Sequence, residues 1–220
     1  MPRQTDRREP FASRPRAFSA DLSRRPLQLR LYPDFVLREV CRPLHDMRRD
    51  VADLARDMLE LMHQHAGIGL AAPQVGLLVQ VIVADIGEDP VCLANPRLLP
   101  TGHTDRMTEG CLSLPEVYVE VEREAAVEVR GLDPTGRPVH FEVQGLMARV
   151  LQHEVDHLHG VLICDYAGGC EDAKPSSKGN ADARAEHAAE RREDRVRGQG
   201  GGGQEHVSGP PRPGDATTRL

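Results

Sequence analysis

The sequence predicts an α+β fold in which antiparallel β-sheets pack around one central helix. Segments rich in Val and Ile follow one another between residues 79 and 143, and a single helical pattern comes directly after them. Strands in a run followed by a helix are typical of antiparallel α+β domains and not of alternating βαβ units. The chain has 220 residues, which is enough for one ordinary domain with flanking segments.

Composition divides the chain into three parts. Residues 1–26 mix Arg, Pro and Ser without apolar periodicity, which predicts a disordered, Arg-rich N-terminal extension. Residues 27–166 contain the apolar patterns and form the predicted folded domain. Residues 167–220 predict a low-complexity, disordered C-terminal tail. Residues 181–197 of this tail contain helix formers, but Val196 is their only large aliphatic residue, so no apolar stripe is available for docking.

Charge and hydropathy exclude several classes of protein. Residues 31–166 carry twice as many acidic as basic residues, which argues against binding to a nucleic-acid backbone. No stretch approaches the roughly 18 apolar residues of a membrane span, and no secretory signal is recognisable. Asp6, Glu9 and Asp21 interrupt the Arg-rich N-terminus. Because transit peptides contain few acids, we do not expect this segment to target an organelle, and we expect a cytoplasmic protein.

Cysteine usage fits a reducing compartment. The five cysteines are an odd number without a C-x-x-C pair, which does not predict a disulfide framework. Cys41, Cys92 and Cys164 are expected to be small buried hydrophobes. Cys111 differs because of its neighbours in the sequence.

Apolar spacing and turn residues predict the individual elements. Residues 46–64 repeat apolar side chains at helical spacing, and Gly67 follows as a stop signal. Residues 133–136 have the sequence Asp-Pro-Thr-Gly, which predicts a hairpin turn. A second helix at residues 145–158 turns Leu146, Val150, His153 and His157 toward one inward face. Strands are predicted at residues 79–86, 91–94, 117–121, 125–132 and 139–143.

Two histidines four residues apart on the second helix predict a metal site. His153 and His157 face the same side and can hold one ion, although the short His-Glu-x-x-His motif alone also permits chance histidines. Cys111, in the run 109–113, adds a third ligand as a thiolate. Three protein ligands leave one tetrahedral position for a water molecule, whose pKa a metal lowers toward about 7. The central helix is therefore predicted to bind a catalytic metal.

Two further residues predict acid–base and oxyanion chemistry. Glu154 lies next to a ligand but off the ligand face, where it can take a proton from water and return it to a leaving amine. Gln74 lies in a glycine-rich stretch at residues 67–76 that lets backbone approach a ligand closely, and its amide can stabilise an oxyanion. This stretch does not match the phosphate-binding patterns. An acid, Asp156 or another, is expected to accept a hydrogen bond from a ligand imidazole.

Three motifs in order, at residues 67–74, 109–113 and 152–157, resemble those of the peptide deformylase family. The resemblance covers residues 27–166, which would be the catalytic domain. It implies a peptide deformylase-like fold and removal of the N-formyl group from the initiator methionine of new polypeptides, with release of formate. It also implies residue roles: metal ligation by Cys111, His153 and His157, general acid–base catalysis by Glu154, oxyanion binding by the Gln74 side chain and the Leu112 backbone N–H, substrate hydrogen bonding by Gly69, and contact with the methionine side chain by Ile68 and Leu146.

The resemblance also implies a cofactor and partners. The family uses Fe²⁺ in cells and accepts Zn²⁺, Ni²⁺ or Co²⁺ in the same ligands, so we expect Fe²⁺, although Cys and His suit both iron and zinc. The expected partners are N-formylmethionyl nascent peptides, with no membrane and no specific nucleic acid. Some members contact the ribosome through a C-terminal amphipathic helix. A transient ribosome contact is therefore a further expectation, although this tail lacks an aliphatic stripe.

Two alternatives remain open at this point. A metallopeptidase with the longer pattern His-Glu-x-x-His-x-x-Gly-x-x-His fits through Gly160, but Ile163 occupies its last ligand position. Asp165 or Glu171 could serve such an enzyme as third ligand, which would leave Cys111 without a role. The other alternative is a catalytically silent member of the same fold, because fold does not fix function.

Overall fold

The computed structural model describes residues 26–46 and 49–170, all within a structural unit that spans Met1–Ser177. A second unit, Lys178–Leu220, lies wholly outside the described residues. So do residues 1–25, which make up almost all of the predicted N-terminal extension, and the helix-forming segment of the predicted tail. The described elements, in chain order, are η2 (Phe35–Arg38), α1 (Arg49–Gln64), β1 (Gly69–Ala71), η3 (Ala72–Val75), β2 (Val81–Ala84), β3 (Val91–Pro100), β4 (Thr104–Cys111), β5 (Leu114–Glu124), β6 (Ala126–Leu132), β7 (Pro138–Gln144), α2 (Gly145–Leu158) and η4 (Ile163–Ala167).

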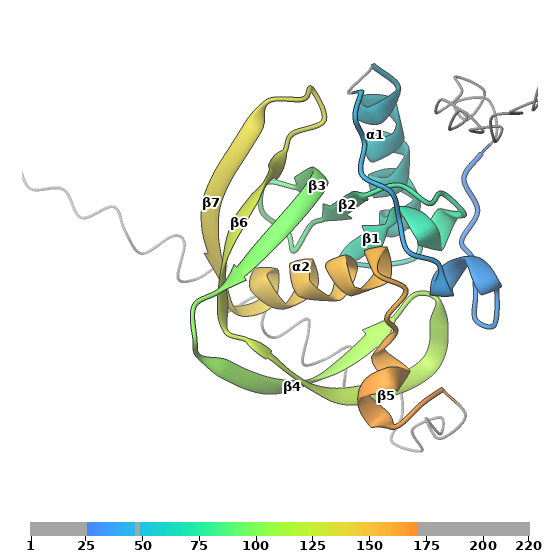
Figure 1. Ribbon diagram of the computed structural model, residues 1–220. Coiled ribbons are helices and arrows are strands. Elements are labelled where there is room, and N and C mark those ends of the chain that lie inside the picture. Colours follow the sequence, from blue (N-terminus) through green and yellow to red (C-terminus); the bar gives the residue numbers. More distant parts are fainter. Residues whose placement is uncertain (1–25, 47–48, 171–220) are drawn as a thin grey trace, which may run out of the picture. The chain divides into compact units, whose positions relative to one another are not determined.

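The strands of the described residues form two antiparallel sheets. A five-stranded sheet has the order β1-β2-β3-β6-β7, and β4 and β5 form a separate two-stranded sheet. Figure 1 shows α2 lying between the larger sheet and the β4–β5 pair. The predicted α+β fold with antiparallel sheets around a central helix is confirmed. Among the described helices, none combines the length and the apolar character that crossing a membrane requires.

Helix α2 matches its predicted range of residues 145–158. It follows β7 directly, because Gly145 adopts a φ of 60° that reverses the chain. It ends where His159 donates its backbone N–H to the carbonyl of Asp156 at 2.9 Å. Its inward face is buried against β1 and β2, as the spacing of Leu146 and Val150 predicts.

Helix α1 packs its apolar face into a second hydrophobic cluster of the core. Met58 and Met62 are fully buried there and share a cluster with Val81 and Val83 of β2. The helix begins at Arg49 and not at residue 46, and residues 47–48 lie outside the described part of the chain. Its end at Gln64 is as predicted, and Gly67 donates its backbone N–H to the carbonyl of Met62 at 2.9 Å.

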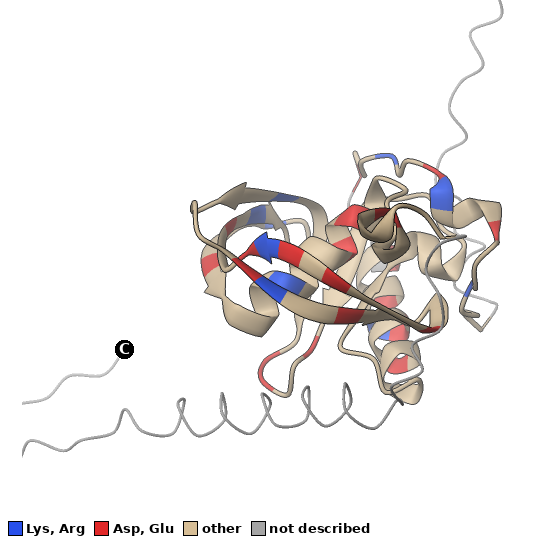
Figure 2. Ribbon diagram, turned by 90° about the horizontal axis from the view of Figure 1, so that it is seen from below, with Lys and Arg blue, Asp and Glu red and all other residues tan. Residues whose placement is uncertain are grey.

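Two of the observed strands, β1 and β4, were not predicted from the sequence. The first, β1, has only three residues and lies in the segment expected to be a glycine-rich loop. The second, β4, exposes most of its polar residues and has no alternation of large apolar side chains. Charged residues, most of them acidic, lie along β4 and β5, which Figure 2 shows from below, and Arg106 pairs with Glu122 at 2.9 Å. Cross-strand pairing, and not burial of an apolar face, therefore defines the outer part of this hairpin.

The remaining strands occur where predicted, but their ends differ: β3, β5 and β7 are longer than predicted, whereas β2 and β6 are shorter. The predicted segment 91–94 extends to Pro100, because Asn95 takes a φ of 49° and the register shifts between Ala94 and Arg97. The predicted turn joins β6 to β7: Asp133 donates its backbone N–H to the carbonyl of Arg137 at 2.8 Å. The hairpin signal in the sequence was therefore correct.

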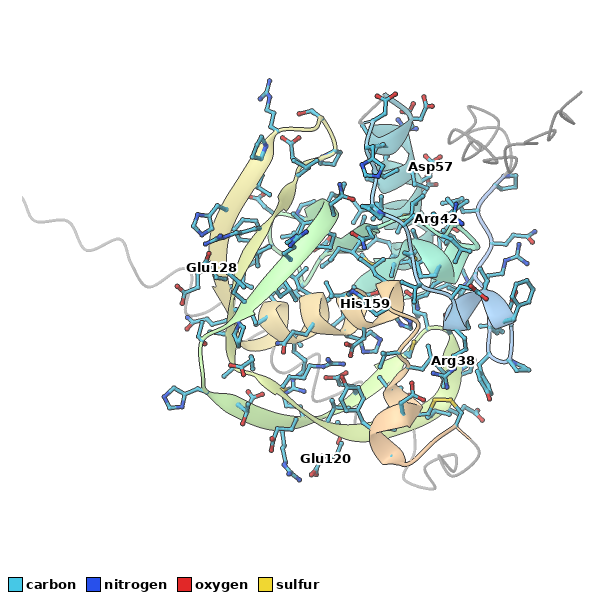
Figure 3. All side chains as sticks on the ribbon, in the orientation of Figure 1. Arg38, Arg42, Asp57, Glu120, Glu128 and His159 are labelled. Carbon is cyan, nitrogen blue, oxygen red and sulfur yellow. A yellow bond between two sulfur atoms is a disulfide. The ribbon has the colours of Figure 1, made fainter. Side chains whose placement is uncertain are left out.

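One pair of cysteines departs from the expectation of free thiols. Cys164, buried as predicted, forms a disulfide with Cys170, which Figure 3 shows as a yellow bond near Arg38. The Arg38 guanidinium donates to Asp165 at 2.9 Å and to the Cys170 sulfur at 3.1 Å. The spacing of six residues contains no motif that predicts a disulfide, so only the fold of η4 brings the two sulfur atoms together.

Candidate metal centre

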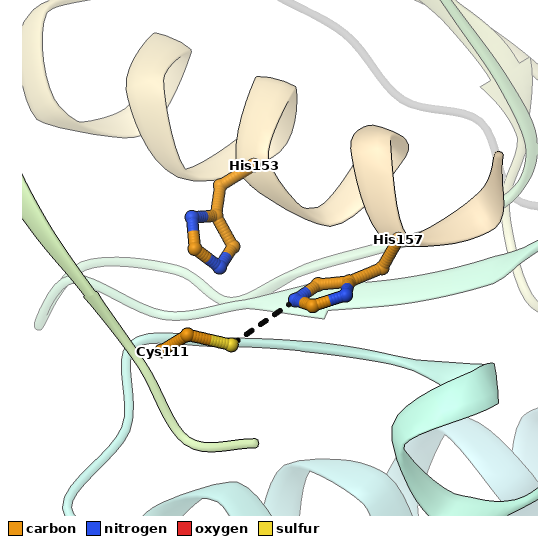
Figure 4. A group of neighbouring side chains, drawn as sticks. All are labelled: Cys111, His153 and His157. Carbon is orange, nitrogen blue, oxygen red and sulfur yellow. Dashed lines mark hydrogen bonds between the residues drawn. The ribbon is translucent and has the colours of Figure 1, made fainter. Parts of the chain in front are cut away.

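Cys111, His153 and His157 come together as predicted. Their donor atoms all lie within 4.8 Å of one another, and the Cys111 sulfur is 3.3 Å from Nε2 of His157 (Figure 4). The two imidazole rings lie edge to face with centroids 5.0 Å apart. A strand end and one face of a helix therefore provide three converging ligands.

A distortion in the hairpin places Cys111. The register of β4 against β5 shifts between Gly110 and Cys111, at the closed end of the pair. Such irregularities turn a side chain away from the regular alternation of a strand. A larger residue at Gly110 would fit tightly, because a Cβ there would lie 3.0 Å from the Tyr118 ring. The sequence Gly-Cys thus brings the thiol toward α2.

The three side chains fit a divalent transition metal. Burial, together with the nearby charges of His153 and Arg123, holds the pKa of His157 well below its usual range, so this ring is neutral as a ligand must be. Its Nδ1 is buried and has no hydrogen-bond partner. A thiolate and two imidazoles suit Fe²⁺ or Zn²⁺, and three protein ligands leave a coordination position open.

Glu109 is the acid that orients a ligand imidazole. Its Oε2 lies 2.9 Å from Nδ1 of His153, which leaves the other ring nitrogen free for the metal. Burial alone would raise the pKa of Glu109, but hydrogen bonds from His153 and Arg123 outweigh it and lower the pKa to about 2. Asp156, the acid named from the sequence, instead accepts from Arg123 at 2.8 Å and from the Tyr166 hydroxyl at 2.8 Å.

Two buried arginines hold Glu109 in turn. Arg123 donates to both carboxylate oxygens at 2.6 and 2.9 Å, and Arg149 donates to Oε1 at 2.8 Å. Arg149 also bonds to Asp105 and to the carbonyl of Val121. No pattern in the sequence predicts this cluster, because its members come from β4, β5 and α2 and are far apart in the chain.

Glu154 lies beside the ligand set in a buried position. Only 3% of the residue is exposed, and Oε2 has no hydrogen-bond partner. Burial raises the pKa of its carboxyl to about 7. A Cβ at Gly69 would overlap this carboxylate, so the backbone of β1 passes directly against it. Glycine at position 69 therefore lets the backbone of β1 lie against the Glu154 carboxylate.

Gln74 reaches the same place from η3. Its Nε2 lies 3.6 Å from the Cys111 sulfur and 3.1 Å from the hydroxyl oxygen of Ser113, while its Oε1 accepts the backbone N–H of Ala71 at 2.8 Å. Gln74 is almost completely buried. The three predicted motifs thus meet, with Ser113 as a contact that sequence reasoning did not single out.

The residues expected to contact substrate are partly or fully buried. Ile68 packs against the apolar cluster that contains Leu146, and Leu112 is half-buried over Gly67. Leu112 also borders an open apolar cavity of about 460 Å³, whose lining comprises Leu27, Gln28, Leu29, Leu31, Leu61, His65, Leu112 and Pro115.

Three ligands that would hold a divalent metal lie beside a buried carboxylate, and a metal held there would supply water activation; the class that the fold and site define is therefore a metal-dependent hydrolase. The longer metallopeptidase pattern does not apply, because Ile163 is buried in a cluster with Val119 and Val121 and cannot be a ligand. The third ligand is Cys111 from β4.

Comparison with known proteins identifies the family. The polypeptide deformylase family model matches residues 26–173. A peptide deformylase of Hydrogenovibrio crunogenus is 41% identical over 155 residues, which cover 69% of this chain and 92% of the relative. One of Alkalilimnicola ehrlichii is 46% identical over 144 residues, which cover 64% and 81%. The chain belongs to the polypeptide deformylase family, and its Cys111, His153 and His157 form the metal site of a peptide deformylase.

Solved structures agree with this assignment. The crystal structure of the Thermotoga maritima peptide deformylase is similar with a TM-score of 0.62 at 40% identity, covering 64% of this chain and 97% of that one. A peptide deformylase from Synechococcus elongatus, in complex with actinonin, has a TM-score of 0.62 at 38% identity, covering 69% and 91%.

Proposed function

We propose that this protein removes the N-formyl group from the N-terminal methionine of newly made polypeptides and releases formate. The observation that carries the proposal is the Glu154 carboxylate, which is buried next to the Cys111, His153 and His157 ligand set with one oxygen unpartnered. A carboxylate in this position can exchange a proton with a reacting group at the open coordination position. The location of the Glu154 carboxylate therefore supports a hydrolytic function and not metal storage alone.

We propose Fe²⁺ as the metal, held by the thiolate of Cys111 and the imidazoles of His153 and His157. When bound, a divalent cation lowers the pKa of water and polarises a carbonyl oxygen. The soft thiolate and the two imidazoles are compatible with iron, and Glu109 holds the His153 ring in the orientation that ligation needs.

Three groups of the chain serve the reaction. Glu154 takes a proton from the attacking water and returns it to the leaving amine, because it is the buried carboxylate at the site. Gln74 Nε2 and the Leu112 backbone N–H stabilise the oxyanion that forms when the formyl carbon is attacked. The position of Gln74, 3.6 Å from the Cys111 sulfur, supports this role.

The substrate lies along β1. Within the described residues β1 pairs only with β2, so its other edge can accept the backbone of an extended peptide, with Gly69 as hydrogen-bonding residue. Ile68 and Leu146 receive the methionine side chain, and their shared apolar cluster supports this role. A peptide chain bound in this way presents its blocked end to Glu154.

Formate release from a formyl-Met tripeptide tests the function. The Fe²⁺-loaded protein is expected to release formate, and Glu154→Gln is expected to lower kcat by roughly 10² to 10⁴, the usual contribution of general acid–base catalysis. Glu60→Gln, an exposed carboxylate on α1, is the matched control and should retain the rate. Cleavage of internal bonds without formate release would support a metallopeptidase, and no turnover at all would support a silent protein.

Location and partners follow from this substrate. We propose that the protein acts in the cytoplasm, where nascent chains emerge, and contacts the ribosome transiently. Co-sedimentation with ribosomes at low and high salt checks the second statement. Absence of co-sedimentation at low salt would contradict it.

A further inference from the structure

We infer that Ser113 is a positioning residue for Gln74, holding the amide so that one of its N–H groups faces the side of Cys111. The inference rests on the proposed function, in which Gln74 binds the oxyanion. Ser113 itself does not reach the reacting atoms in this scheme. It acts by fixing the direction of a neighbouring hydrogen-bond donor.

The hydrogen bonds of the Gln74 amide define this role. The amide nitrogen carries two hydrogens and the amide oxygen accepts. The oxygen accepts from the Ala71 backbone N–H at 2.8 Å, which distinguishes the oxygen end from the nitrogen end. One N–H donates to the Ser113 hydroxyl at 3.1 Å, and the other is left to face Cys111, whose sulfur lies 3.6 Å away.

Burial makes the Ser113 contact hard to replace. Ser113 is 0% exposed and Gln74 is 1% exposed, so bulk water has no access to the amide if the hydroxyl is removed. A buried donor without a partner is unfavourable. The amide would then turn to find one, and its second N–H would lose its fixed direction toward Cys111.

The two backbones that carry this pair are themselves tied together. The backbone N–H of Arg30 donates to the carbonyl of Gln74 at 2.7 Å, and that of Tyr32 donates to the carbonyl of Ser113 at 2.8 Å. The segment of residues 30–32 thus joins η3 to the β4–β5 turn through main-chain hydrogen bonds. The distance between the Ser113 hydroxyl and the Gln74 amide is set by main-chain bonds and does not depend on the two side chains alone.

The expected effect is on turnover and not on binding. Loss of a complete oxyanion donor costs about 10² to 10³ in rate. Loss of its orientation should cost less, about tenfold in kcat, which corresponds to the net contribution of one hydrogen bond. KM and metal content should stay unchanged, because the hydrogen bonds of Ser113 within the described residues go to Gln74 and Tyr32, and none goes to β1 or to a ligand atom.

A double-mutant cycle on the metal-loaded protein tests the inference. Ser113→Ala is expected to lower kcat about tenfold in the wild-type background and to have no further effect in Gln74→Ala. Thr101→Val removes an exposed hydroxyl that donates to the Ala126 carbonyl at 2.8 Å, and it is expected to leave kcat unchanged. An equal drop in both backgrounds, or an unchanged rate for Ser113→Ala, would overturn the inference.

A second pair of variants covers the case in which Ser113→Ala fails to fold or loses metal. Ser113→Thr keeps the hydroxyl, whereas Ser113→Val has nearly the same shape without it. The Thr variant is expected to exceed the Val variant in kcat by about tenfold, and equal rates would contradict the role of the hydroxyl. Failure of the proposed function is seen separately: Gln74→Ala alone would then retain the wild-type kcat.

Discussion

Gly69 shows how a single residue without a side chain makes room for chemistry. The position that a Cβ would take is occupied by the Glu154 carboxylate, and Val150 Cγ1 lies 2.8 Å from that position. The glycine is required for space, since its φ is not in the left-handed region. It allows the backbone of β1 and the buried carboxylate to lie side by side.

Gly69→Ala is therefore expected to displace Glu154 and to lower kcat about 100-fold, the cost of misplacing a catalytic group by about 1 Å. Metal content, measured by atomic absorption, should remain. Gly102→Ala is the control: it strains a residue at φ +95° in an open turn, so it should lower stability without changing kcat. A fully active Gly69→Ala would show that Glu154 does not need its observed position.

Cys41 gives a pH dependence that is independent of the metal site. Burial raises the pKa of its thiol to about 12 from the ordinary 9.0. Above about pH 9 the unfolded chain loses this proton while the folded chain keeps it, so the contribution to stability is full below that pH and is lost as pH rises toward 12. Urea midpoints measured from about pH 8 to 10 should fall more steeply for wild type than for Cys41→Ala. Parallel slopes would contradict the raised pKa.

At the scale of elements, α1 is held by packing and not by its surface charges. Met58 is fully buried in the core, whereas Arg56 pairs with Asp53 at 2.8 Å on the outer face, where 66% of the Arg56 side chain is accessible. We expect Met58→Ala to lower the free energy of unfolding by about 2 to 5 kcal/mol. Arg56→Ala should cost less than about 1 kcal/mol. Urea denaturation of both variants provides the measurement, and similar losses would contradict this division.

The elements differ in how far sequence predicts them. Helix α2 could be predicted residue by residue, because its apolar spacing and its two histidines share one face. Strand β4 could not, because its partners on β5 are charged and its pairing leaves no apolar period in the sequence. The site followed the same division: Cys111, Gln74 and the histidines belong to local motifs, while Arg123 and Arg149 enter only through tertiary packing.

At the scale of the whole molecule, a buried ion cluster joins the β4–β5 hairpin to α2. Arg123 of β5 is at its centre, bonded to Glu109 of β4 and to Asp156 of α2. Its side chain also lies 5.3 Å from the centroid of the Tyr166 ring. The cluster therefore links β4, β5 and α2, and its Glu109 contacts the metal-ligand residue His153.

Removing Arg123 should weaken both fold and metal binding. Arg123→Met is expected to cost about 3 to 5 kcal/mol, because it leaves buried carboxylates without their cation. It should also lower metal affinity by about 10 to 100-fold through the loss of support for the ligand imidazole. Urea denaturation and a competitive chelator titration measure the two effects.

Arg106→Met, on the same hairpin, is the control for this variant. Its side chain is 65% exposed and its partner Glu122 is also accessible, so removal should cost less than about 1 kcal/mol and leave metal affinity unchanged. If Arg106→Met and Arg123→Met behaved alike, the buried cluster would not link the hairpin to the helix.

The location of the ligands on two distant stretches of chain has a consequence during synthesis. Cys111 lies at the closed end of the β4–β5 hairpin, which can pair locally, but both imidazoles belong to α2 and are made more than 40 residues later. A growing chain that has not yet reached His153 has only one of the three donors in place. Metal loading therefore has to follow translation of α2, and the newly made enzyme becomes active only after its own central helix has left the ribosome.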